Sequence, residues 1–170
     1  MSRSPSASGQ PLTAGMRWML YAASGLVFSV GIPLFLAPAQ TETFFAWTIA
    51  SPLTAAFLGG AYWASCGLEF MAARQRRWSH ARVAVPAVVL FTALTLLVTL
   101  LHIDRFHFDS PALITRMGTW VWLAVYASVP LIMGFLAFRQ LRAPAAPLGD
   151  APPEIPLAGW IRSILFVNAG

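Results

Sequence analysis

Residues 83–102 read VAVPAVVLFTALTLLVTLLH, and this stretch decides the class of the fold. It carries no charged side chain between Arg82 and its closing histidine. A helix of about 20 residues is about 30 Å long, which matches the hydrocarbon thickness of a bilayer. Because lipid offers no partners for open backbone groups, a stretch of this kind is expected to cross the membrane as a helix.

Three further stretches have similar length and apolarity: residues 17–36, 53–73 and 117–138. We therefore expect an all-α, polytopic membrane protein, with a bundle of four transmembrane helices within residues 16–142. No glycine-rich phosphate loop and no catalytic-triad spacing occurs in the sequence. The sequence accordingly predicts neither an enzyme nor a bound cofactor.

The basic residues predict the orientation of this bundle. The chain has eleven arginines and no lysine, and nine of the arginines lie before or at the start of the first stretch, between the second and third, or after the fourth. These nine are Arg3, Arg17, Arg74, Arg76, Arg77, Arg82, Arg139, Arg142 and Arg162. The positive-inside rule then places both termini in the cytoplasm, with the plasma membrane as the expected location. Arginines beside anionic lipid explain the basic charge, so we expect no nucleic-acid partner.

The regions that flank the bundle are polar or rich in proline. Residues 1–15 are predicted to be a disordered tail, and residues 143–156 form an Ala/Pro-rich linker. Ala37-Pro38-Ala39 resembles a signal-peptide cleavage site, but the apolar run before it is longer than a typical signal. We therefore expect the first helix to be retained.

The end of the chain resembles its beginning. The pattern Arg-x-x-Leu-aromatic-x-x-x-Gly begins at Arg17 and again at Arg162. Residues 157–170 are therefore either an amphipathic foot on the membrane surface or the start of a fifth transmembrane helix. The second alternative implies an internal duplication, with a second half that this chain lacks.

Three segments carry a family resemblance: FAWTI followed by PLTAAFLG in residues 45–59, LHIDRFHF in 101–108, and WVWLAVY in 120–126. In these segments the chain resembles a group of uncharacterised bacterial multi-pass membrane proteins of the actinobacterial, high-GC type. The resemblance covers most of residues 16–142. It implies a membrane fold and a longer, duplicated form in some members, and it implies no activity.

The second apolar stretch has two different faces. Small residues recur at helical spacing and predict close helix packing: Ala56, Gly60, Ala64 and Gly67. Tyr62, Ser65, Cys66 and Glu69 lie roughly opposite. Glu69 is the only carboxylate within an apolar stretch, which makes it a candidate functional residue. The alternative is a structural ion pair with Arg17, Arg74 or Arg82.

The third stretch carries a polar stripe made of Thr92, Thr95, Thr99 and His102. Threonines in membrane helices often return their hydroxyl groups to their own helix, so the stripe can simply face the bundle. The functional alternative is a track for protons or a small solute that joins Tyr62 and Glu69 to His102.

The loop after this helix contains His102, Asp104 and His107, whose side chains are possible ligands of zinc or another transition metal. Their spacing matches no established metal motif. In the first long loop, residues 37–51, Phe44, Phe45 and Trp47 are typical of an interfacial belt, with a lid over a pocket as the alternative.

These observations favour a non-enzymatic structural or assembly component of the membrane. Its expected partners are the lipid bilayer and either a second copy or a missing second half. We expect the second copy or half to bind through the small-residue face of the second stretch, which we call the seam. The alternative function is a small transporter or proton-coupled carrier that uses Glu69 and the polar track.

Overall fold

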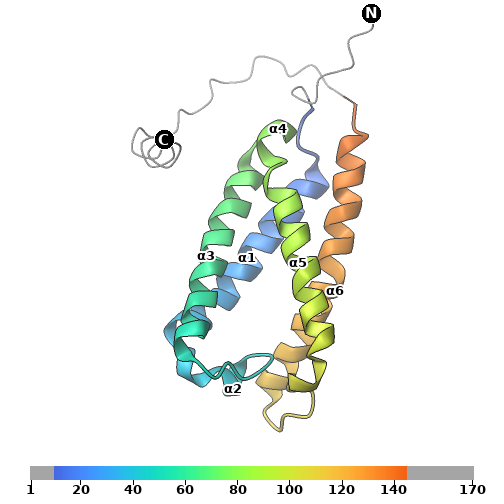
Figure 1. Cartoon of the computed structure of the whole chain (residues 1–170). Helices are drawn as coiled ribbons and strands as arrows, with labels where there is room; N and C mark the ends of the chain where they lie inside the picture. Colours follow the sequence, from blue (N-terminus) through green and yellow to red (C-terminus); the bar gives the residue numbers. More distant parts are fainter. Residues whose placement is uncertain (1–9, 145–170) are drawn as a thin grey trace, which may run out of the picture.

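The computed structural model describes residues 10–144, and within them the fold is entirely helical (Figure 1). Four long helices carry it: α1 (Ala14–Leu36), α3 (Pro52–Arg74), α5 (Ala84–Leu101) and α6 (Leu113–Leu141). Short helices fill the connections: η2 (Pro38–Gln40), α2 (Thr41–Phe44), α4 (Trp78–Ala81) and η3 (Ile103–Arg105). The prediction of an all-α chain is confirmed for these residues.

Three segments are long and apolar enough to cross a membrane: Ala14–Leu36, Trp78–Leu101 and Leu113–Leu141. They indicate a multi-pass membrane protein. The surfaces of these segments agree with a lipid environment, since at most 28% of the most apolar part of each is buried inside the protein. Helix α3 has the same 23-residue length as α1, but it is less apolar and is not among the three.

The long helices form two hairpins that face each other. Helix α1 packs along α3, and α5 packs along α6, whereas α1–α6 and α3–α5 contacts are sparser. Two buried clusters hold the hairpins together at opposite ends. Met16, Leu20 and Met133 belong to the first, and Leu34, Phe45 and Trp122 to the second. The space between these clusters is where the candidate site lies.

One end of the bundle gathers the arginines. The start of α1, the α3–α5 connection and the end of α6 meet there (Figure 1), so we call it the arginine-rich end. A strap of residues 10–13 closes it: Leu12 N donates to Arg76 O (2.9 Å), and Trp78 N donates to Gln10 O (2.9 Å).

Gln140 anchors this strap from α6. Its side chain is fully buried, accepting a hydrogen bond from Thr13 N and donating one to Pro11 O, each at 2.8 Å. The expected disorder of residues 1–15 is therefore wrong for residues 10–15, because the strap has specific partners in α6 and in the α3–α4 turn. The expected linker beyond residue 144 and the foot or fifth helix at 157–170 lie outside the described residues.

The opposite end is lined by aromatic side chains, and we call it the aromatic end. Residues 37–51 fold back across it, and Trp47 forms an isolated β-bridge with Phe106. Thr115 and Thr119 of α6 donate hydrogen bonds to Thr43 O and Ala46 O, at 2.7 and 3.1 Å. This loop is thus fastened to the second hairpin and does not lie free.

Candidate functional site

A cavity of about 530 Å³ lies between the two hairpins, and all four long helices contribute to its wall. Most of that wall is made of alanine, valine, leucine and phenylalanine. Its polar side chains are Tyr62, Ser65 and Glu69 from α3, Thr92 from α5, and Tyr126 from α6. An apolar cavity with a few converging polar groups is the usual form of a small-molecule site.

Glu69 is the most unusual of these groups. It is only 2% exposed, and its Oε1 accepts a hydrogen bond from the Ser65 hydroxyl one turn earlier, at 3.0 Å. Its Oε2 is buried and has no hydrogen-bond partner. Leaving such an oxygen unsatisfied is costly in apolar surroundings. Among the described residues nothing satisfies this oxygen, so it is free to accept a hydrogen bond from a molecule in the cavity.

The arginines do not supply this partner. In the part of the chain that the structure describes, Glu69 forms no ion pair with Arg17, Arg74 or Arg82. Arg17 instead reaches Gln75 O at 3.4 Å, and Arg74 lies 5.8 Å from the centre of the Phe70 ring. The structural alternative for Glu69, an arginine ion pair, is thus not realised.

The hydroxyl groups of the cavity are mostly committed as donors. Ser65 donates to Glu69, and Thr92 donates to Val88 O of its own helix at 2.8 Å. The Tyr62 and Tyr126 hydroxyls are 2.9 Å apart and share one hydrogen bond. Only one phenol hydrogen of this set is left over, so the wall offers more acceptor than donor capacity.

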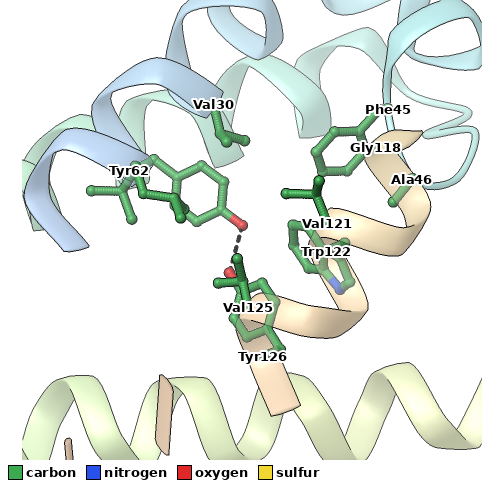
Figure 2. Close-up of a pocket in the computed structure, with 11 residues that line it drawn as sticks. Val30, Phe45, Ala46, Tyr62, Gly118, Val121, Trp122, Val125 and Tyr126 are labelled. Atoms are coloured by element: carbon green, nitrogen blue, oxygen red, sulfur yellow. Dashed lines mark hydrogen bonds between the residues drawn. The ribbon is translucent and has the colours of Figure 1, made fainter. Parts of the chain in front are cut away.

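A second, smaller hollow of about 90 Å³ lies beyond the tyrosine pair (Figure 2). Its wall includes Phe45 and Ala46 of the first long loop, and Gly118 and Trp122 of α6. Both hollows share Tyr62 and Tyr126, whose bonded hydroxyls face each other in Figure 2. The tyrosine pair therefore marks the boundary between the two.

The exposed lining residues on α3 and α5 indicate that the large cavity opens sideways between these two helices. Three apolar lining residues on this side are also exposed on the protein surface: Phe57 (76%), Leu68 (46%) and Phe91 (49%). The side chains on this side of the cavity are therefore apolar, as expected of a surface that faces lipid.

The structure brings only part of the predicted polar track together. Tyr62, Glu69 and Thr92 line the cavity, but Thr95 and His102 do not. Thr99 is buried and accepts a hydrogen bond from the Trp122 indole at 3.1 Å. His102 is exposed, and its Nδ1 lies 3.1 Å from Val98 O of its own helix. The expected continuous track to His102 is thus interrupted at the level of Trp122.

The predicted seam is placed on the surface of α3. Ala64 and Gly67 are exposed, Ala56 and Gly60 are half-buried, and a methyl group on Gly67 would meet no atom within 4 Å. The close approach of α1 and α3 uses other glycines. A methyl group on Gly59 would lie 2.8 Å from Phe35 N and 3.0 Å from Gly31 O. Inside the bundle, therefore, α1 packs on Gly59 and not on the predicted seam.

The metal candidates are not assembled into a site. No group of three or more possible ligands comes together within residues 10–144. Asp104 pairs with Arg105 at 3.1 Å, while the two ring nitrogens of His107 lie 3.2 Å from Phe45 O and 3.1 Å from Thr48 Oγ1. His107 therefore joins the loop after α5 to the first long loop, whereas Asp104 and Arg105 form an exposed pair of neighbouring residues.

Tyr126 is the site residue that the sequence pattern did not identify. It follows Trp120 and Trp122, so it resembles one more member of an interfacial aromatic belt. Its burial (5% exposed) and its bond to Tyr62 depend on how the second hairpin faces the first. No local signal in the sequence encodes that arrangement.

Comparison with known protein families, with curated proteins and with solved structures finds no match to this chain. The resemblance to the bacterial multi-pass group therefore stays a prediction, and the site must be interpreted from its own geometry.

Proposed function

We propose that this protein is a small integral-membrane carrier in which Glu69 binds a solute or a proton inside the interhelical cavity. One observation carries the proposal: a carboxyl oxygen that is buried, unpartnered and placed on a cavity built by all four long helices. Buried ionisable groups within membrane helices are costly, and in transport proteins they mark solute and proton pathways.

The proposal includes four membrane crossings, with α3 as the fourth, and cytoplasmic termini. Helix α3 is as long as α1 and packs along it, so its ends lie near those of a helix that is apolar enough to span. The arginines of the first, third and last segments favour the arginine-rich end as the cytoplasmic one. We place the protein in the plasma membrane on the same grounds.

Reporter domains inserted at residues 43, 76 and 109 and fused after residue 144 test this topology. We expect the insertions at 76 and 144 to report the cytoplasm and those at 43 and 109 the opposite side. If the reporters at 43 and 76 lie on the same side, α3 does not cross and the cavity cannot serve a carrier.

The carrier function itself is tested with proton movement induced by solutes. Purified protein is reconstituted in vesicles that contain a trapped pH indicator, and probes with one apolar body and different head groups are added. We use adamantane bearing a guanidinium, a hydroxyl or a sulfonate group. The expected result is proton movement induced by at least one probe, lost in Glu69→Gln and kept in Glu42→Gln, which makes the same change at an exposed site.

A second candidate function, assembly with another copy or with a second half, is supported by the exposed seam. Ala64 lies both on the seam and on the cavity wall, so a partner seated there would also cover the lateral opening. The substitution Gly67→Leu is expected to break such a complex. Gly134→Leu on α6 is the control, because a methyl group there also meets nothing within 4 Å. Unchanged assembly in Gly67→Leu, measured by native mass in detergent, argues against this function.

A further inference from the structure

We propose that the ligand of the Glu69 cavity is a compact lipophilic cation that carries N–H donors, an alkylammonium or alkylguanidinium group on an apolar body. This inference rests on the proposed binding function of the cavity and specifies its substrate class. It follows from three properties of the wall: its charge, its donor balance and its opening.

The charge of the wall favours a cation. Among residues 10–144, Glu69 is the only acidic or basic side chain on the cavity wall, and none of Arg17, Arg74 and Arg82 forms an ion pair with it. A carboxylate held in apolar surroundings without a counter-ion is strongly disfavoured, and a bound cation with hydrogen-bond donors offsets part of this cost. An anionic ligand would add a second negative charge to the same cavity.

The donor balance favours N–H groups. Glu69 Oε2 needs a donor, whereas the hydroxyl hydrogens of Ser65 and Thr92 are already bound to Glu69 Oε1 and to Val88 O. An ammonium or guanidinium group brings only donors, so it complements a wall rich in free acceptors. A quaternary ammonium has the charge but lacks the donors, and an alcohol has a donor but lacks the charge.

The opening favours an apolar body. Phe57, Leu68 and Phe91 surround the entrance between α3 and α5, and they are exposed where lipid is expected. The cavity volume of about 530 Å³ is within the range of sites for small organic molecules. The remaining wall is apolar, so it gains contacts only from a ligand that is apolar apart from its head group.

A proton and this cation compete for one carboxylate. The other titratable groups that face Glu69 are Tyr62 on α3 and Tyr126 on α6, and tyrosines ordinarily lose their proton only at about pH 10. Helices α1 and α5 contribute no titratable side chain to the wall. Cation affinity should therefore fall with decreasing pH, by up to about tenfold per unit where Glu69 is mostly protonated.

The test is equilibrium binding of radiolabelled 1-adamantylguanidinium to the full chain in lipid nanodiscs, with empty nanodiscs as background. A guanidinium stays charged across the accessible pH range, so any pH dependence belongs to the protein. We expect at least tenfold weaker binding in Glu69→Gln and unchanged binding in Glu42→Gln. In the wild type, 1-adamantanol and adamantyltrimethylammonium should each compete at least tenfold more weakly than unlabelled adamantylguanidinium.

The comparison of probes needs no variant, so it stands even if Glu69→Gln fails to fold. Equal competition by the alcohol, or binding that ignores pH, would overturn the cation assignment. Equal binding to Glu69→Gln would place the cation elsewhere. If the guanidinium does not bind while the hydroxyl or sulfonate probe still causes Glu69-dependent proton movement, only the substrate class is wrong. If no probe causes such proton movement, the proposed carrier function is wrong as well.

Discussion

Tyr62 of α3 and Tyr126 of α6 join the two hairpins through a 2.9 Å hydrogen bond between their hydroxyl groups. Both side chains are buried, at 3% and 5% exposure, and both belong to the walls of the two hollows. This bond couples the relative position of the hairpins to the shape of the cavity. It therefore belongs to the binding site as well as to the fold.

Replacing one tyrosine of this pair by phenylalanine should destabilise the protein, because the remaining hydroxyl stays buried without a partner. We expect a loss of about 1 kcal/mol for Tyr62→Phe or Tyr126→Phe, in the range of interhelical hydrogen bonds in membranes. The double variant should be no less stable than either single variant, since no unsatisfied hydroxyl remains. Unfolding curves in mixed micelles measure all four proteins. Additive losses in the double variant would contradict the coupling.

The crossing of α1 and α3 gives a second prediction. Gly59→Ala should destabilise the first hairpin by about 1–3 kcal/mol, because its methyl group would overlap backbone atoms of Phe35 and Gly31. The matched change on the same helix, Gly67→Ala, meets only open space and should shift stability by less than about 1 kcal/mol. Thermal unfolding in detergent compares them. Equal effects would mean that Gly59 is not the point of closest approach.

The positions of the helices could be predicted from the sequence because apolar length is a local property. The expected stretch at residues 53–73 corresponds to α3 (Pro52–Arg74), and that at 83–102 to α5 (Ala84–Leu101). A proline marks the start of α3, and a group of arginines marks its end. The number of membrane crossings, however, depends on how α3 is seated in lipid, and its hydropathy alone leaves this open.

The contacts between helices could be predicted only in part. Glu69 is conspicuous in sequence because it is an acid in an apolar stretch. Whether Glu69 forms an ion pair or faces a cavity depends on where α1 and α5 place their side chains. Gly59 and Gly60 are equivalent by pattern, yet only Gly59 lies close to the backbone of α1. The pairing of Tyr62 with Tyr126 likewise follows from the packing of hairpins, which no motif encodes.

The strap at the arginine-rich end gives a third prediction. Gln140→Ala should free residues 10–13, because the buried amide of Gln140 bonds both Thr13 N and Pro11 O. We expect faster hydrogen exchange at the amide of Thr13 and a loss of about 1–3 kcal/mol. Gln75→Ala removes a glutamine whose side chain bonds only Met71 O, on the surface, and serves as the control. Unchanged exchange at Thr13 would show that the strap is held by its backbone bonds alone.

The loop at the aromatic end gives the last prediction. Comparing variants of its two histidines distinguishes a structural role from a metal site. His107 reaches Phe45 O and Thr48 Oγ1 in the first long loop, whereas the ring of His102 bonds Val98 O of its own helix. His107→Ala should therefore raise hydrogen exchange in residues 41–49 by about tenfold, the effect of losing roughly 1.4 kcal/mol of local stability. His102→Ala should leave exchange there unchanged. Added zinc should not slow hydrogen exchange in residues 41–49 of the wild type, because both ring nitrogens of His107 already have partners. If zinc slows exchange in residues 41–49 and both histidine variants abolish this protection, the two residues form a metal site and the structural assignment of His107 is wrong.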